Sequence, residues 1–148
     1  MIEPQIIYYP LYEDKDKFII LITGGRGSGK SFNASTFVER LTFEMTEVEK
    51  IVHQILYTRY TMVSAGMSII PEMMEKIDLD GTTKYFKTTK TDIVNRMTKS
   101  RIMFRGIKTS SGNQTAKLKS IQGITTFVCD EAEEWTNEEE FDKIMLSI

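Results

Sequence analysis

The stretch GGRGSGKS, residues 24–31, decides the fold that this sequence predicts. It fits the phosphate-loop pattern G-x-x-x-x-G-K-[ST] at every fixed position, namely Gly24, Gly29, Lys30 and Ser31. An apolar run of strand length, residues 18–22, precedes the loop, and residues 32–45 behind it place apolar side chains at helical spacing. A strand, a glycine-rich loop and a helix in this order form the setting of a nucleotide phosphate site, and we therefore predict one here.

The residue types in the loop explain how it would hold phosphate. A loop that wraps a phosphate turns its N–H groups inward and needs positive φ angles, which glycine adopts at little steric cost. Lys30 would bring positive charge to the β- and γ-phosphates, and Ser31 would offer a hydroxyl to Mg²⁺. The alternative is a Gly/Ser-rich turn without a ligand. The predicted nucleotide-binding residues of the loop are Gly24, Gly25, Arg26, Gly27, Ser28, Gly29, Lys30 and Ser31.

A second group of chemically active residues follows the apolar run at residues 124–129, which we predict to be a buried strand. Asp130 and Glu131 come directly after this run, roughly a hundred residues beyond the phosphate loop. A carboxylate can ligate a hard cation, and it can also accept a hydrogen bond or a proton from water. We therefore predict that Asp130 lies beside Mg²⁺ and that Glu131 polarises the attacking water.

The bulk composition narrows the function classes. The chain has 148 residues, 41% of them hydrophobic, which suits one globular domain with a real core. Its formal net charge is −2, so any surface for nucleic acid would have to be local. One Cys and one His exclude an internal disulfide and do not supply the ligands of a structural zinc site. No apolar run is long enough to cross a membrane.

The remaining pattern predicts an open α/β sheet. The predicted strands are residues 18–23, 51–58, 83–88 and 124–129, with a hairpin formed by residues 93–97 and 101–106. The predicted helices are residues 30–46, residues 62–77 with a break at Pro71, and a last helix from about residue 137. Residues 107–119 read as a loop or a short helix. Continuous apolar strands are typical of a parallel sheet, so we predict a mostly parallel sheet flanked by helices on both faces, with a β-hairpin insertion.

Two further segments are placed to reach a nucleotide. Arg59 follows the predicted strand at residues 51–58, and strand ends face the ligand crevice in an open α/β sheet. The alternative for Arg59 is an arginine that faces solvent or DNA. Ahead of the loop, Tyr8 or Tyr9 would stack on the base and Gln5 would bond its edge, whereas the alternative is an extended edge segment whose tyrosines pack on the sheet.

Together these motifs resemble the N-terminal ATPase domain of phage terminase large subunits, the motors that pump DNA into procapsids. Four features carry the resemblance: Arg26 at the third loop position, the LYTR run at residues 56–59, the hairpin strand at 101–106 with its link at 117–123, and the acidic strand end at 127–134. The resemblance covers essentially the whole chain.

The resemblance implies a P-loop NTPase of the RecA-like (ASCE) class, with ATP and Mg²⁺ as cofactors. Lys30 and Arg26 would then neutralise charge on the transferring phosphoryl group, Ser31 and Asp130 would hold Mg²⁺, and Glu131 would activate water. Hydrolysis would drive double-stranded DNA into a capsid in the cytoplasm of the infected bacterial host. The implied partners are the portal protein, the small terminase subunit and further copies of the chain in a ring, with no membrane.

Two parts of the family pattern have no counterpart in the sequence, namely a coupling strand after residues 130–131 and a nuclease domain. We therefore expect residues 1–148 to be the N-terminal ATPase domain of a longer protein without the last part of the ATPase core, able to bind nucleotide with little turnover. Two other readings stay open. One is a DNA helicase or remodelling ATPase, which would need the arginines of a second domain. The other is a nucleotide-dependent interaction module that does not hydrolyse its ligand.

Overall fold

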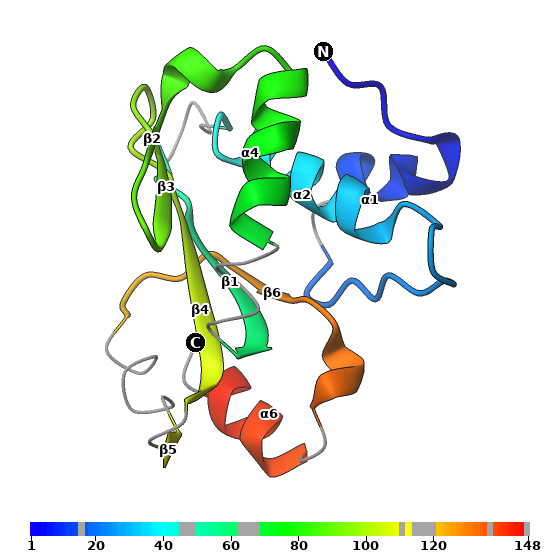
Figure 1. Cartoon of the computed structure of the whole chain (residues 1–148), viewed down its shortest axis with the longest axis vertical. Helices are drawn as coiled ribbons and strands as arrows, with labels where there is room; N and C mark the ends of the chain where they lie inside the picture. The colour runs from blue at the N-terminus through cyan, green and yellow to red at the C-terminus, as the bar shows by residue number, and fades with distance from the viewer. Residues whose placement is uncertain are drawn as a thin grey trace.

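The computed structural model describes residues 1–14, 17–44, 50–61, 69–109, 112–113, 121–135 and 138–146 (Figure 1). The helical elements in these ranges are η1 (Ile6–Tyr8), α1 (Tyr9–Glu13), α2 (Lys30–Leu41), α4 (Ile70–Leu79), η3 (Thr83–Tyr85), η4 (Ala132–Glu134) and α6 (Glu138–Met145). The strands are β1 (Gln54–Thr61), β2 (Phe86–Thr88), β3 (Asp92–Asn95), β4 (Arg101–Thr109), β5 (Gly112–Asn113) and β6 (Thr126–Cys129). Within the described ranges, no helix has the length and apolar character that crossing a membrane requires.

The strands form one mixed sheet in the order β2-β3-β4-β1-β6, with β5 paired to β4. β1 is parallel to both of its neighbours, β4 and β6, whereas β2, β3 and β5 join antiparallel. The predicted α/β class and the predicted hairpin are therefore confirmed, but the sheet is mixed rather than mostly parallel. The short turn at residues 96–100 explains the difference, because strands joined by so few residues can only pair antiparallel.

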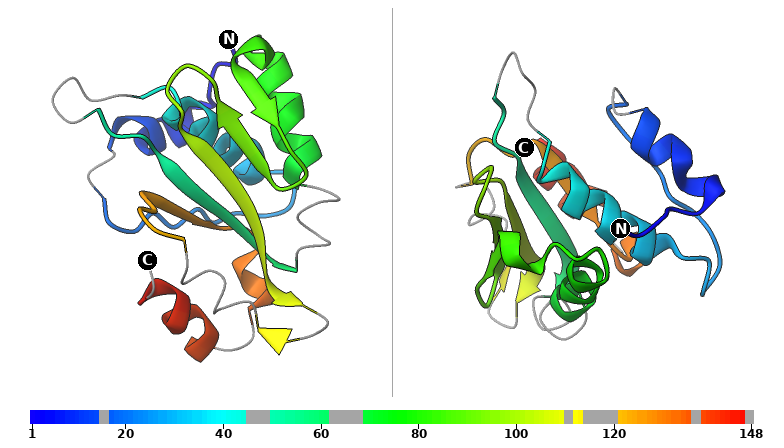
Figure 2. Two further views of the ribbon diagram at one scale, coloured as in Figure 1. Left: turned by 90° about the vertical axis from the view of Figure 1, so that its left-hand side faces the viewer. Right: turned by 90° about the horizontal axis from the view of Figure 1, so that it is seen from above.

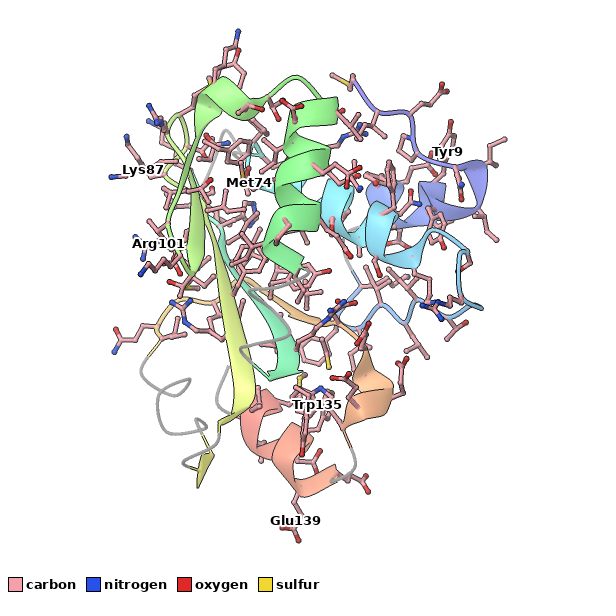
Figure 3. All side chains as sticks on the ribbon, in the orientation of Figure 1. Tyr9, Met74, Lys87, Arg101, Trp135 and Glu139 are labelled. Carbon is pink, nitrogen blue, oxygen red and sulfur yellow. The ribbon has the colours of Figure 1, made fainter. Side chains whose placement is uncertain are left out.

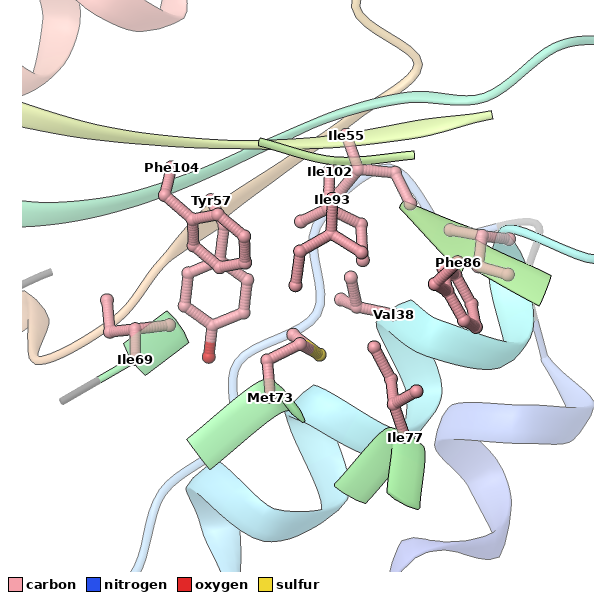
Figure 4. Packing of buried hydrophobic residues seen from close by; sticks show 11 residues of the cluster. Val38, Ile55, Tyr57, Ile69, Met73, Ile77, Phe86, Ile93, Ile102 and Phe104 are labelled. Carbon is pink, nitrogen blue, oxygen red and sulfur yellow. The ribbon is translucent and has the colours of Figure 1, made fainter. Parts of the chain in front are cut away.

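Helices cover both faces of the sheet, as predicted (Figure 2). On one face, α2 and α4 contribute Val38, Met73 and Ile77 to a core that also holds Tyr57 and Phe104 of the two central strands (Figure 4). On the other face, α6 places Ile144 against Leu56 and Met103. Successive residues of β1 and β4 thus face opposite layers, as the two-residue period of a strand requires.

The predicted strand at residues 18–23 is wrong. The chain there forms no strand, and Phe18, Ile19 and Leu21 are 91%, 69% and 82% exposed. An apolar run has strand propensity, but a strand also needs a neighbour with which to exchange hydrogen bonds. Among the described strands none pairs with these residues, and β6 ends the sheet with β1 as its partner. The segment nevertheless leads directly into the glycine-rich loop.

The N-terminal segment also differs from the extended edge that the sequence suggested. It folds into η1 and α1, with Pro10 in the first turn of α1 and Leu11 buried. Proline fixes its own φ near the helical value and lacks the N–H that the first turn cannot use, which explains why a helix starts here.

Other boundaries shift by a few residues. β1 continues to Thr61, so Arg59 lies inside the strand rather than after it. α2 ends at Leu41, five residues before the predicted end, because both the N–H and the hydroxyl of Thr42 bond to the carbonyl of Glu39, at 3.0 and 2.6 Å. α4 carries Pro71 in its first turn, which agrees with the predicted break. The predicted loop at 107–119 begins as part of β4, which continues to Thr109. Some residues of the predicted elements lie outside the described residues, namely 45–46, 62–68, 110–111 and 114–119.

Candidate nucleotide-binding site

The glycine-rich loop leads straight into the N-terminus of α2. Gly29, the residue before the helix, has φ 82°, a left-handed value that other residues adopt only with strain. A Cβ at this position would also lie 3.3 Å from Oε1 of Gln5, so the loop is closely packed there. Within the described part of the chain, no side chain caps α2. The N–H groups of its first turn therefore point out at the loop, as an anion-binding helix end requires.

Lys30 is the first residue of α2, and its side chain turns back over the loop. Its Nζ donates to the carbonyl of Gly25 at 3.0 Å and also to that of Gly24. The ammonium group thus lies at the loop. Arg26 is exposed, and within the described residues it has no ion pair. Ser31 follows Lys30 in the first turn and is half-buried.

The N-terminal helices hold the loop from behind. Tyr8 Oη donates to the carbonyl of Ser28 at 2.8 Å, and Tyr12 Oη donates to that of Asn33 at 3.2 Å. Asn33, which the sequence analysis did not single out, is buried and donates from Nδ2 to the carbonyl of Gly29 at 3.0 Å. The structure thus places Gln5 and Tyr8 against the loop, whereas the predicted contact of these residues with a base stays a prediction.

The predicted carboxylates lie at the end of β6, and Arg59 of the neighbouring strand joins them. Nε and Nη2 of Arg59 each lie 2.9 Å from Oδ2 of Asp130, and Nη2 lies 3.2 Å from Oε1 of Glu131. The side chains of Arg59 and Asp130 are 9% and 14% exposed, whereas that of Glu131 is 42% exposed. Arg59 therefore contacts the acidic strand end, a pairing that the sequence analysis did not foresee.

Burial and charge act against each other at this pair. Burial raises the pKa of Asp130 above its ordinary value, and the adjacent Arg59 guanidinium opposes the rise without cancelling it. Burial lowers the pKa of Arg59, but the charge and hydrogen bond of Asp130 outweigh this, so the pKa stays above the usual value. Burial, followed by the charge of Asp130, raises the pKa of the Cys129 thiol to about 11, so that the thiol stays protonated at neutral pH.

The backbone at Glu131 has an uncommon conformation. Its φ of 52° lies in the left-handed region, which costs a non-glycine residue about 1–3 kcal/mol. The angle turns the chain out of β6 and into η4. It also directs the Glu131 side chain to the ion pair with Arg59. Strain of this kind is commonly retained at functional positions.

The loop and the acidic strand end lie on the same side of the molecule (Figures 1 and 2). Among the described residues, neither Lys30 nor Ser31 contacts Asp130 or Glu131. Nor do the described residues contain a cluster of three acidic, His or Cys side chains that could hold a metal ion. Mg²⁺ in a nucleotide site needs only one or two carboxylates, because phosphates and waters supply its other ligands. The residues present therefore fit Mg²⁺ carried by a nucleotide.

The fold and the site define a mixed α/β protein with a glycine-rich loop at a helix N-terminus and two carboxylates at a neighbouring strand end. Residues 16–148 match the family model described as phage terminase large subunit, so the chain belongs to that family. No curated protein matches the chain. Family membership confirms the resemblance and points to a role in phage DNA packaging, together with DNA and the packaging machinery as partners.

Proposed function

We propose that this chain binds ATP with Mg²⁺ at residues 24–31 and hydrolyses it to drive double-stranded DNA into a viral procapsid. One observation carries the proposal: the glycine-rich loop opens onto the uncapped N-terminus of α2, with the Lys30 ammonium already held at the loop. Such an arrangement offers N–H groups, a helix dipole and a fixed charge to a phosphate chain. The family supports DNA packaging rather than a helicase role.

Each remaining residue has a role in this proposal. Ser31 and Asp130 hold the Mg²⁺ that arrives with the nucleotide, and the ion supplies positive charge to the phosphate oxygens. Glu131 orients the attacking water and accepts its proton. Arg26 folds over the γ-phosphate and stabilises the charge that develops on its oxygens. Tyr8, whose hydroxyl bonds to the loop at Ser28, lies against the base.

Arg59 contributes indirectly, since it holds the two carboxylates. It lies on β1, the parallel neighbour of β6. We therefore assign Arg59 a positioning role at the acidic strand end rather than a contact with the nucleotide. In the infected bacterial cytoplasm, the proposed motor would work as a ring of copies with the portal protein and the small terminase subunit.

One observation favours a second candidate, a nucleotide-binding module that does not hydrolyse its ligand. The ion pair with Arg59 occupies Glu131, the carboxylate that would orient water. A protein that kept this pair with nucleotide bound would hold ATP without turnover. Phosphate release by the full-length large subunit separates the two candidates, because the motor releases phosphate and the module does not.

Calorimetric titration of ATP tests the site. The wild-type chain should bind ATP, and more tightly with Mg²⁺ than with EDTA. Asp130→Asn should remove most of this difference, because an amide is a poorer ligand for a hard cation. Asp142→Asn, on the exposed surface of α6, is the matched control and should keep the difference. A wild-type chain that binds no ATP would contradict the proposal.

A further inference from the structure

Positive charge gathers on one region of a chain whose formal net charge is −2. Residues 84–105 hold seven Lys and Arg but only one acidic residue, Asp92. This segment spans β2, β3 and the first half of β4, at the edge of the sheet away from β6. In an acidic protein, a local cluster of this kind is the usual electrostatic footprint of a polyanionic partner.

The strand register sorts these side chains onto one face. Lys87 of β2 lies opposite Val94 of β3, which lies opposite Arg101 of β4, so the three residues form a row across the sheet. Their neighbours Phe86, Ile93 and Ile102 point the other way, into the core beneath α2 and α4. Figure 3 shows Lys87 and Arg101 projecting on the side away from these helices.

No described helix covers the row. α6 packs on the same face but at its other end, where Ile144 contacts Leu56 and Met103. Lys87 and Arg101 are exposed, and the exposed Lys90, Arg96 and Lys99 flank them on the adjoining turns. We call these five residues the basic face.

The charge of the basic face is largely unneutralised. Asp92 lies 2.8 Å from Nη1 of Arg105 but 3.8 Å from Nη1 of Arg101, so it pairs mainly with Arg105. Within the described part of the chain, Lys87, Lys90, Arg96 and Lys99 have no ion pair. Lys99 Nζ donates to the carbonyl of Arg96 at 2.9 Å, and the charges of all four side chains remain without an acidic partner among the described residues.

We propose that the basic face binds the sugar-phosphate backbone of duplex DNA. The proposal deepens the packaging role proposed above and rests on it for the choice of DNA. Lys87 and Arg101 lie two strands apart, roughly 10 Å by the usual strand spacing, which is comparable to the width of a DNA groove. Long Lys and Arg side chains at this spacing can reach phosphates on both sides of a groove.

The side chains on the face favour a duplex over a single strand. Proteins that bind single strands stack bases on exposed aromatic rings. The row consists of Lys87, Val94 and Arg101, none of which can stack as a ring. The nearby Tyr85 is half-buried and packs against Phe43, with ring centroids 5.7 Å apart. Binding should therefore depend on charge and carry little sequence preference.

Fluorescence anisotropy with a labelled 30-base-pair duplex tests the proposal. The Lys87→Ala/Arg101→Ala variant should bind about 5–10-fold more weakly at low salt, and its plot of log affinity against log salt concentration should be shallower by about 2. Lys87→Glu should weaken binding more than Lys17→Glu, which makes the same charge change at an exposed lysine on another segment. Both residues are exposed, so these variants should fold, and circular dichroism checks this.

Two outcomes would overturn the basic face as the DNA surface. One is a wild-type chain that fails to bind the duplex at low salt, and the other is a double variant that binds with unchanged salt slope. Neither of these affects ATP binding at residues 24–31, which is measured separately by calorimetry. Failure of the DNA surface is therefore distinguishable from failure of the proposed nucleotide site.

Discussion

Arg59 donates from Nε to Oδ2 of Asp130 at 2.9 Å, and its Nη2 forms an ion pair with the same oxygen at 2.9 Å, across the parallel strands β1 and β6. The two side chains are mostly buried, so each depends on the other to offset the cost of removing a charge from water. The pair fixes Asp130 and, through the contact of Nη2 with Glu131, the orientation of both predicted functional carboxylates.

Arg59→Gln should destabilise the fold. The change leaves Asp130 buried without its cation, at an expected cost of about 2–3 kcal/mol, somewhat below that of a fully buried pair. Urea unfolding measures the loss. Arg101→Gln is the matched control, because Arg101 is exposed and lies 3.8 Å from its partner Asp92, and it should change stability by less than about 0.5 kcal/mol.

A double-mutant cycle separates the ion pair from general packing at Arg59. Combined with Asp130→Asn, Arg59→Gln should cost less than it does alone, with a coupling energy of about 1–3 kcal/mol. Additive effects of the two changes would show that Arg59 stabilises the strand by packing rather than by positioning the carboxylate.

The stability of the chain should also depend on Glu39. This residue is fully buried in α2, and burial raises the pKa of its carboxyl to about 7, with a smaller rise from Asp80, while the Thr82 hydroxyl and Arg40 oppose the shift. Because the folded-state pKa lies above the ordinary carboxyl value of 4.5, the folded state favours the protonated acid. The stability that Glu39 contributes is therefore present below about pH 4.5 and lost as the pH rises through about 7.

Glu39→Gln removes this titration. At pH 8 the variant should be more stable than the wild type by up to about 3 kcal/mol, and near pH 4.5 the difference should largely vanish. Urea unfolding at the two pH values measures this. Glu3→Gln, at an exposed position, should leave the pH dependence unchanged. Parallel pH profiles for wild type and Glu39→Gln would contradict the assignment.

The sequence correctly predicted those elements that depend on local residue patterns. The start of α2 at Lys30 and the hairpin of β3 and β4 depend on neighbours within a few residues, and both are found as expected. The Arg59–Asp130 pair depends on the register of β1 against β6, where Thr58 lies opposite Cys129. That register joins residues about seventy positions apart and could not be read from either segment alone.

Two features that local sequence patterns do not reveal have the same origin. Residues 18–23 have the composition of a core strand, but composition does not supply a pairing partner. Glu39 is an acidic residue of α2, yet it is fully buried, because α4 and the following turn cover that side of the helix and Thr82 donates to its Oε1. In both places, packing between elements that are distant in the sequence determines the structure.

Glu131→Gln should leave ATP binding intact and stop hydrolysis. The amide keeps the size and hydrogen-bonding shape of the side chain but cannot accept the proton of the attacking water. Calorimetry measures binding, and phosphate release by the full-length large subunit measures turnover. Parental turnover in this variant would exclude Glu131 as the carboxylate that activates water.

Arg26→Ala should reduce turnover far more than it weakens ATP binding, by roughly 10³-fold or more if Arg26 acts as an arginine finger. Arg26 is exposed and has no ion pair among the described residues. Its side chain is therefore able to move onto a bound nucleotide. Arg26→Lys should rescue little, since a point charge cannot reproduce the planar fork. If turnover in Arg26→Ala stays within a few-fold of the parental value, Arg26 is not an arginine finger but an exposed surface residue.

The most direct test of the central claim is calorimetric titration of ATP with Mg²⁺ into wild-type, Lys30→Ala and Lys17→Ala chains. Lys30 bonds only to exposed loop carbonyls among the described residues, so its removal should leave the melting temperature nearly unchanged. Lys30→Ala should bind ATP about 100-fold more weakly, the loss expected for a charge-assisted phosphate contact, while Lys17→Ala should bind as the wild type does. Wild-type affinity in a folded Lys30→Ala chain would contradict the assignment of residues 24–31 as the nucleotide site.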